Sequence, residues 1–124
     1  MAKEHVKKWI NAWNRHDLKT ILSMYSEDIE FSSPKIKVFF PKIQPTKITN
    51  KKDLTAYFTN ALKNYPNLQF TLKESIFHSN TCLIEYYMTT NRLLKTRISV
   101  IEKFELQRGL IKKSSAFYGA EEQI

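Results

Sequence analysis

Glu102 is the residue whose surroundings in the sequence point most directly to chemistry. It shares the alternating register of Val100 and Phe104, so its carboxyl is expected on the apolar face of a strand. A buried carboxyl either pairs with a cation or hydrogen-bond donor or shifts towards its protonated form. Two interpretations stay open: a general acid or ligand anchor, and a structural pair with a buried tyrosine, tryptophan or lysine. A strand bulge would instead turn the side chain outward.

Other reactive residue types exclude several kinds of site. The histidines His5, His16 and His78 are not spaced as metal ligands, and the single cysteine, Cys82, excludes an internal disulfide and a cysteine-based zinc site. The chain has two glycines, which leaves no glycine-rich phosphate-binding loop of either common kind. We therefore expect no metal and no cofactor. A lone cysteine is typical of a reducing compartment.

Positive charge is concentrated in one stretch of the chain. The net charge is +8, and residues 35–67 hold seven lysines against one acidic residue, Asp53. Such a patch attracts anionic partners, although a solvated basic surface is the simpler interpretation. Basic and aromatic residues interleave at 35–42, but no recognised nucleic-acid motif accompanies them, so nucleic acid is not an expected partner.

Three amphipathic helices are predicted to position these residues. Apolar residues recur at helical spacing in residues 6–13, in residues 18–25 after a possible cap at Asp17, and in residues 54–65 after a possible cap at Asn50. Pro66 ends the third helix. Each helix needs a sheet or another partner to cover its apolar face.

Beyond Pro66 the apolar period changes from 3.6 to 2. Strands are predicted at 68–76, 82–88, 98–106 and 111–118, with an earlier one at 29–33 and a possible edge strand at 35–40. Helices followed by long antiparallel strands define an α+β class, with the helices on one face of a curved sheet. The 124 residues form one domain, 1–124.

No apolar run approaches the ~20 residues that span a bilayer. The first residues lead directly into an amphipathic helix, so we expect no signal peptide, no membrane partner and a cytoplasmic location. Large aromatic side chains and one methionine are expected to build the core and to line a cavity. These are Trp9, Trp13, Tyr25, Phe31, Tyr57, Phe58, Tyr86, Met88, Phe104 and Phe117.

Several motifs, in their order and spacing, resemble SnoaL-like proteins of the nuclear transport factor 2-like superfamily. They are AWNRHDL at 12–18, MYSEDIEF at 24–31, Ser33-Pro34, LTAYF at 54–58, YPNLQF at 65–70 and GLI at 109–111. The resemblance covers roughly residues 5–119. It implies a cone of three helices against a strongly bent sheet, a pocket between them, and frequently a homodimer through the outer face of the sheet.

The resemblance also allows catalytic positions to be compared one by one. In isomerase-like members a general-base aspartate precedes the proline that ends the first strand, and here that position is Ser33. The hydrogen-bonding tyrosine of the first helix corresponds to Trp9, and a protonated aspartate corresponds to Glu102. Polyketide cyclases use an acidic residue near the end of the last strand, but residues 116–119 contain none. The known family mechanism is therefore not preserved, and whether the chain is an enzyme stays open.

Two hypotheses follow from these observations. In the first, the domain binds a small apolar or aromatic ligand in an enclosed pocket, with Glu102 and Ser33 as its catalytic or polar groups and with weak isomerase, lyase or hydrolase chemistry. In the second, it is a non-catalytic interaction or dimerisation module that uses the lysine-rich segment 35–52.

Overall fold

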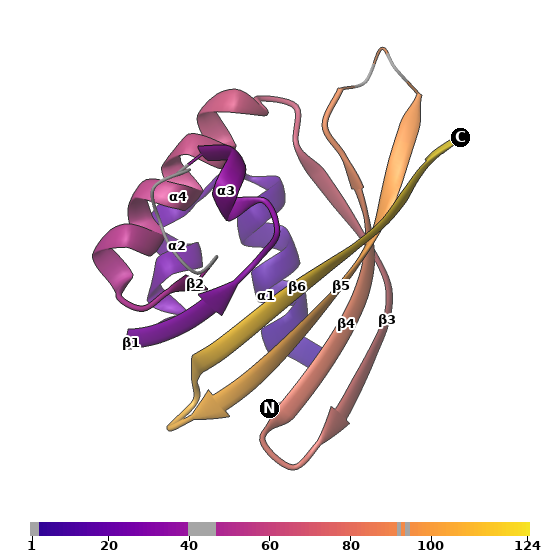
Figure 1. The fold of residues 1–124 in the computed structure, drawn as a ribbon. Coiled ribbons are helices and arrows are strands. Elements are labelled where there is room, and N and C mark those ends of the chain that lie inside the picture. The colour runs from indigo at the N-terminus through magenta and orange to yellow at the C-terminus, as the bar shows by residue number, and fades with distance from the viewer. Residues whose placement is uncertain (1–2, 40–46, 92, 94) are drawn as a thin grey trace.

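The computed structural model describes residues 3–39, 47–91, 93 and 95–124, and it confirms the α+β class (Figure 1). The helices are α1 (Lys3–Asn14), α2 (Leu18–Ser23), α3 (Ile36–Phe39) and α4 (Lys51–Asn64). The strands are β1 (Tyr25–Ser32), β2 (Lys47–Ile48), β3 (Gln69–His78), β4 (Thr81–Thr89), β5 (Thr96–Gln107) and β6 (Leu110–Gln123). The sheet order is β2-β1-β6-β5-β4-β3; β1 runs parallel to β6 and the other neighbours are antiparallel.

The helices begin where the sequence provides caps. Asp17 accepts a hydrogen bond from the backbone N–H of Thr20 at 3.2 Å at the start of α2. Asn50 accepts one from the backbone N–H of Asp53 at 2.8 Å at the start of α4. Each cap satisfies a backbone donor that has no partner inside its helix, so both predicted caps are confirmed. The helices pack together against one face of the bent sheet (Figure 1).

Two local predictions are wrong. The second helix ends at Ser23 and Tyr25 begins β1, because Tyr25 pairs with Ile111 of β6 rather than extending the helix. The described part of the predicted edge strand at 35–40 is instead the helical turn α3. Ser33 starts this turn: its side chain accepts the backbone N–H of Lys35 at 3.2 Å, and such local bonds compete with strand pairing.

A bulge in β6 decides which of its side chains face the helices. Leu106 of β5 lies opposite Ile111, whereas the preceding residue, Glu105, lies opposite Lys113. Lys112 is therefore the extra residue on β6. Because side chains alternate between the faces of a sheet, one extra residue reverses every side chain that follows it.

The bulge places Ala116 and Tyr118 towards the helices and Phe117 on the outer face. Ala116 is buried, whereas Phe117 is 60% exposed. An uninterrupted alternation from Ile111 predicts that Phe117 faces inward. The prediction that Phe117 lines the pocket is therefore wrong.

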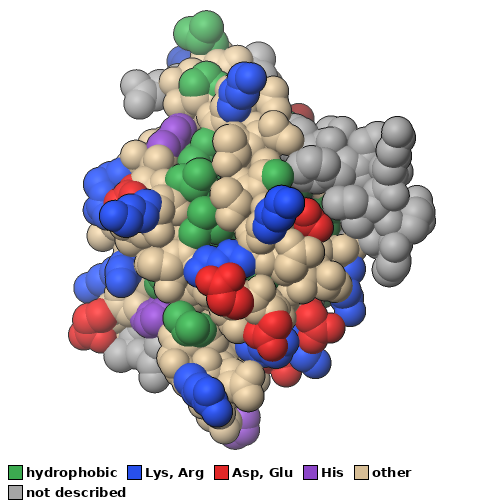
Figure 2. All heavy atoms as spheres, turned by 90° about the vertical axis from the view of Figure 1, so that its left-hand side faces the viewer, with side chains coloured by type: hydrophobic (Ala, Val, Ile, Leu, Met, Phe, Trp, Pro, Cys, Tyr) green, Lys and Arg blue, Asp and Glu red, His purple; other side chains and the backbone are tan. Residues whose placement is uncertain are grey.

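The lysine-rich segment is partly neutralised by acidic residues of β1. Lys47 Nζ lies 3.7 Å from Glu30 Oε1, and Lys51 Nζ lies 3.6 Å from Glu27 Oε1. Figure 2 shows the helical side of the molecule, on which basic and acidic side chains lie beside one another. Residues 40–46 of the segment lie outside the described part. These ion pairs reduce the net positive charge of the patch, so they do not favour the interaction-module hypothesis.

Candidate functional site

Glu102 lies in the middle of the sheet, on β5 between β4 and β6. Its neighbours across the sheet are Ile84 on β4 and Ala116 on β6. The side chain is 6% exposed and faces the helices, as its alternation with Val100 predicts. Tyr86 lies two residues beyond Ile84 on the same face of β4, and this diagonal position brings its long side chain within reach of the carboxyl.

Hydrogen bonds from both neighbouring strands hold the carboxyl of Glu102. The Tyr86 hydroxyl donates to Oε1 at 2.6 Å, and the Ser114 hydroxyl donates to Oε2 at 3.4 Å. Burial raises the pKa of Glu102 from its ordinary 4.5 to about 7, although the hydrogen bonds from Tyr86 and Ser114 both favour the charged form. Burial therefore outweighs the two donors, and the group is close to half-protonated at neutral pH.

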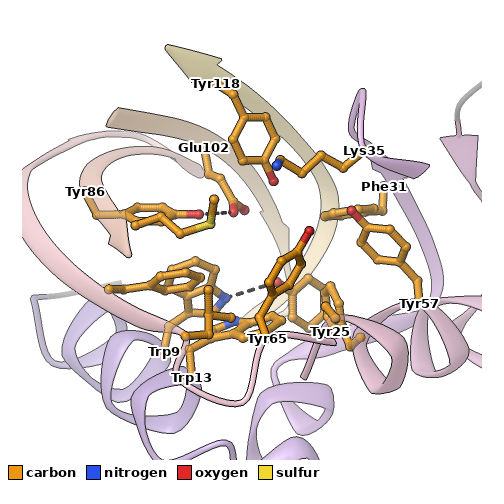
Figure 3. Close-up of a pocket in the computed structure, with 15 residues that line it drawn as sticks. Trp9, Trp13, Tyr25, Phe31, Lys35, Tyr57, Tyr65, Tyr86, Glu102 and Tyr118 are labelled. Carbon is orange, nitrogen blue, oxygen red and sulfur yellow. Dashed lines mark hydrogen bonds between the residues drawn. The ribbon is translucent and has the colours of Figure 1, made fainter. Parts of the chain in front are cut away.

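The carboxyl opens onto a cavity of about 60 Å³ between the sheet and the helices. Figure 3 shows Glu102 and Tyr118 reaching into the cavity from the sheet, opposite Tyr57 and Tyr65 from the helical side. The rest of the wall is mostly aromatic and includes Trp9. This volume exceeds what one water molecule needs, whereas a cavity that admits benzene measures about 150 Å³, so an aromatic ligand enters only when side chains of the wall move apart.

Most of the aromatic residues predicted to line a pocket lie on this wall, and so does Met88; Phe104 and Phe117 do not. Phe104 is buried behind the wall, where its ring packs edge-on against Trp9 at 5.4 Å between centroids. It is a core residue that supports Trp9. Phe117, on the outer face, lines a shallow surface groove instead.

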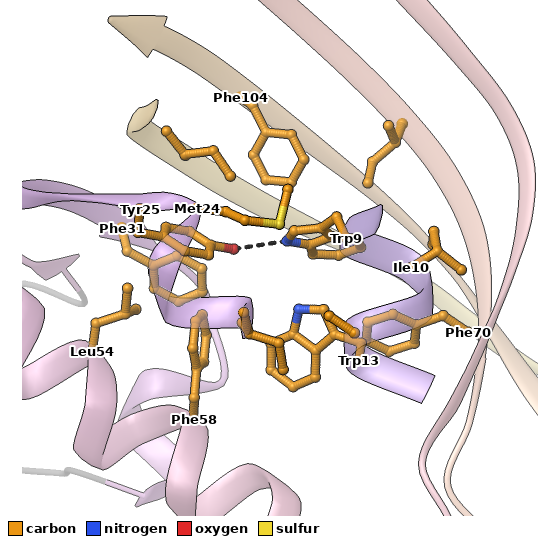
Figure 4. Close-up of a cluster of buried hydrophobic side chains, with 14 of the residues drawn as sticks. Trp9, Ile10, Trp13, Met24, Tyr25, Phe31, Leu54, Phe58, Phe70 and Phe104 are labelled. Carbon is orange, nitrogen blue, oxygen red and sulfur yellow. Dashed lines mark hydrogen bonds between the residues drawn. The ribbon is translucent and has the colours of Figure 1, made fainter. Parts of the chain in front are cut away.

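Two indole N–H groups lie at the helical side of the cavity. Trp9 Nε1 donates to the Tyr25 hydroxyl at 3.0 Å, whereas Trp13 Nε1 is buried without a hydrogen-bond partner in the described part of the chain. Figure 4 shows the Trp13 nitrogen on the edge of the ring that faces the Trp9–Tyr25 pair. Buried polar groups are usually satisfied, so the Trp13 donor is a position at which an acceptor would be stabilised.

Ser33 is buried at the end of β1, beside the cavity but not on its wall. Its hydroxyl also forms hydrogen bonds that lower the pKa values of Tyr57 and Tyr118. Burial is the larger effect, and it raises the pKa of Tyr57 to about 12 and that of Tyr118 further still. Both phenols therefore keep their protons at neutral pH.

Sequence reasoning missed several residues of the wall, among them Lys35, Tyr65, Phe70 and Tyr118. Lys35 Nζ lies 4.9 Å from the centre of the Tyr118 ring, a cation–π distance. The helical stripe that ends at Tyr65 and the alternation around Phe70 could have indicated both residues. Nothing in the sequence locates the bulge that turns Tyr118 inward or the helical turn that positions Lys35.

The fold is the one found in nuclear transport factor 2-like proteins. The SnoaL-like domain model matches residues 6–114, and the chain belongs to this family. No curated protein matches the sequence. Across the described residues, no three His, Cys, Asp or Glu side chains group closely enough to hold a metal ion, and no helix has the length and apolarity needed to span a membrane.

Solved structures share the fold over nearly the whole chain. A SnoaL-like protein of unknown function from Burkholderia thailandensis is 28% identical, with a TM-score of 0.83 over 96% of this chain and 95% of that one. A nuclear transport factor 2-like protein of unknown function from Burkholderia xenovorans is 13% identical, with a TM-score of 0.76 over 98% and 85%. A protein with a ketosteroid isomerase-like fold from Catenulispora acidiphila, in complex with trimethylamine, is 12% identical, with a TM-score of 0.76 over 96% and 88%.

Proposed function

We propose that the cavity binds a small apolar or aromatic ligand and that Glu102 exchanges a proton with it, in an isomerase, lyase or hydrolase reaction. The observation that carries this proposal is the carboxyl of Glu102, which faces an aromatic cavity and has a pKa of about 7. A group that is half-protonated at neutral pH serves equally as general acid and general base. No protein partner is needed to explain these features.

The surroundings of Glu102 suit proton transfer. As an acid, its carboxyl gives a proton to a ligand oxygen and becomes a carboxylate, which the Tyr86 hydroxyl already faces at 2.6 Å. As a base, the carboxylate takes a proton from the ligand and returns to the neutral form that burial favours. The Tyr86 hydrogen bond thus remains formed through the cycle and holds the carboxyl in place.

The unpartnered N–H of Trp13 is a second, independent observation in favour of ligand binding. Its Nε1 donor is buried at the cavity and has no partner in the described part of the chain. Leaving a buried donor unsatisfied costs about 1–3 kcal/mol. A ligand with an acceptor atom near this nitrogen would recover that cost.

We assign Ser33 and Trp9 positioning roles. Ser33 accepts the backbone N–H of Lys35 and lowers the pKa values of Tyr57 and Tyr118, so it acts on three residues that line the cavity. Trp9 directs its N–H to the Tyr25 hydroxyl. Neither residue replaces the base and the tyrosine of isomerase-like relatives, and the proposed chemistry rests on Glu102.

The domain is also proposed to form a homodimer through the outer face of the sheet. Ile76, Ile101 and Phe117 are 55%, 43% and 60% exposed on that face. Ile101 lies directly opposite Phe117 on β6, and Leu83 lies directly opposite Ile76 on β3, while across β4 and β5 the residues opposite Leu83 and Ile101 are Lys103 and Glu85. Exposed apolar side chains grouped on one face mark interaction sites, and a second copy offers the same face.

The chain's tryptophans make ligand binding measurable. It has two, Trp9 and Trp13, and both line the cavity, so intrinsic fluorescence reports directly on its occupancy. Benzamide, a neutral single-ring probe, is expected to change this fluorescence saturably and with little dependence on salt. The Glu102→Gln variant is expected to shift the benzamide affinity. A wild-type signal that stays unchanged up to the solubility limit of the probe would contradict the proposal.

A further inference from the structure

Lys35 brings a positive charge to the wall of an otherwise aromatic cavity. It lies between β1 and α3, is half-buried, and lines the cavity. Figure 3 shows its side chain extending towards Tyr118 on the side of the cavity where Glu102 also lies. A lysine stem often packs on apolar surface while its ammonium group stays hydrated, and here the ammonium lies over the ring of Tyr118, another residue of the cavity wall.

No carboxylate in the described part of the chain forms an ion pair with Lys35. Its neighbours in the same lysine-rich segment, Lys47 and Lys51, each pair with an acidic residue of β1. The Lys35 ammonium instead lies over the face of the Tyr118 ring. Its charge is thus the one in this segment that is turned to the cavity and left without a counter-charge among the described residues.

Glu102 does not supply the missing counter-charge. Its two oxygens accept hydrogen bonds from Tyr86 and Ser114. A nearby ammonium would favour the charged carboxylate, yet the pKa of Glu102 is raised to about 7 by burial and is opposed only by those two hydroxyls among the described groups. About one pH unit below that value the carboxyl is largely neutral and does not repel a second anion in the cavity.

Two phenol hydroxyls share the cavity wall with the ammonium. Tyr57 and Tyr118 line the same cavity as Lys35, and both stay protonated at neutral pH because burial raises their pKa values. A wall that carries an ammonium group and hydroxyl donors is suited to a carboxylate, which accepts several hydrogen bonds and cancels the charge. At the opposite side, Trp9, Trp13 and Phe70 offer rings to an apolar body.

We propose that the ligand of this cavity is an aromatic carboxylate, whose anionic head lies against Lys35 while its ring lies among the tryptophans. This rests on the proposed function and specifies the chemical class of its ligand. The ring provides the apolar burial, and the carboxylate provides the counter-charge that Lys35 lacks among the described residues.

Three probes with one ring and one substituent separate the possible ligand charges. Benzoate, benzamide and benzylamine are anionic, neutral and cationic at about pH 6, where Glu102 is mainly protonated. Tryptophan fluorescence titrations of the wild type are expected to show benzoate binding about tenfold more tightly than benzamide, with benzylamine weakest. Equal affinities for benzoate and benzamide would overturn the anion assignment while leaving ligand binding intact. Failure of all three to bind would contradict the proposed function itself.

Variants at two lysines test whether the preference for benzoate depends on Lys35. Lys35→Met keeps the stem and removes the charge, so it is expected to abolish the advantage of benzoate over benzamide. Lys35→Arg keeps the charge and is expected to retain the advantage. Lys37→Met is the matched control, because Lys37 is exposed in α3 and does not line the cavity. A benzoate preference that persists in Lys35→Met would overturn the role of Lys35.

Discussion

The hydroxyl of Tyr86 on β4 donates a 2.6 Å hydrogen bond to the carboxyl of Glu102 on β5, and both side chains are buried. A buried carboxylate is costly, and one strong donor recovers part of that cost. The pKa of about 7 for Glu102 expresses this balance, since burial raises it and the hydrogen bonds lower it. The pair is thus poised between its two protonation states at neutral pH.

The titration of Glu102 can be observed directly. In protein labelled with ¹³C at glutamate carboxyls, one resonance is expected to titrate near pH 7, and it should be missing from Glu102→Gln. All other glutamates serve as internal references in the same spectrum. A Glu102 resonance that titrates near the ordinary value of 4.5 would show that the carboxyl is hydrated rather than buried.

Removing the hydroxyl of Tyr86 should raise the pKa of Glu102 further. The Tyr86 hydrogen bond favours the charged carboxylate, so Tyr86→Phe shifts the balance towards the neutral acid. Above pH 7 the variant is expected to lose about 1–3 kcal/mol of unfolding free energy, because the carboxylate loses its strongest donor. Ser114→Ala is the comparison: its 3.4 Å contact is longer, so its effect on the pKa should be smaller. A larger change of the Glu102 pKa in Ser114→Ala than in Tyr86→Phe would contradict the conclusion that Tyr86 is the stronger donor.

The stability of the fold should depend on pH through Glu102. Its pKa is higher in the folded chain than the ordinary 4.5, so between about pH 4.5 and 7 the folded state holds a proton that the unfolded state has released. The contribution of Glu102 to the free energy of unfolding is fully present below this pH window. It is lost as the pH rises through the window, by about 3 kcal/mol in total.

Urea unfolding of the wild type and of Glu102→Gln at several pH values isolates this contribution. Between pH 4.5 and 7, the unfolding free energy of the wild type should fall relative to that of Glu102→Gln. Above pH 7 the difference between the two proteins should be constant. Other titrating groups contribute equally to both proteins and cancel. A difference that does not change with pH would mean that Glu102 has the same pKa folded and unfolded.

The proposed homodimer depends on the outer face of the sheet. Ile101→Lys places a charge opposite Phe117 at the centre of that face. Light scattering coupled to size-exclusion chromatography is expected to show a dimer for the wild type and a monomer for Ile101→Lys. Leu93→Lys is the control, because Leu93 is also exposed but lies between β4 and β5, in their connection. A wild-type monomer at micromolar concentration would contradict the proposal.

The sequence predicts the fold and the central residue of the site because both follow from periodicity. The stripe that contains Trp9 and Trp13 identifies α1, and the alternation around Glu102 places its carboxyl inside. These patterns repeat over many residues, so packing against the opposite layer reinforces each of them. The helix caps at Asp17 and Asn50 are equally readable, since each depends on one side chain and its own helix.

The rest of the cavity wall depends on two local features, a strand bulge and a turn, that leave no periodic pattern in the sequence. The extra residue at Lys112 exchanges Phe117 for Tyr118 on the inner face. The turn begun by Ser33 replaces an expected strand with α3 and carries Lys35 to the cavity. A bulge is set by pairing with a neighbouring strand and a turn by one hydrogen bond, so alternation of apolar residues cannot reveal either.

Native mass spectrometry after incubation with benzamide tests the central claim, ligand binding in the cavity, most directly. Ala61 lines the cavity, so Ala61→Phe fills it without removing a polar group, whereas Ala56→Phe adds the same ring on the exposed side of α4. Circular dichroism confirms that both variants fold. The wild type and Ala56→Phe should each carry one ligand mass per chain, and Ala61→Phe should carry none. A wild type without added mass, or an added mass that persists in Ala61→Phe, would contradict binding in this cavity.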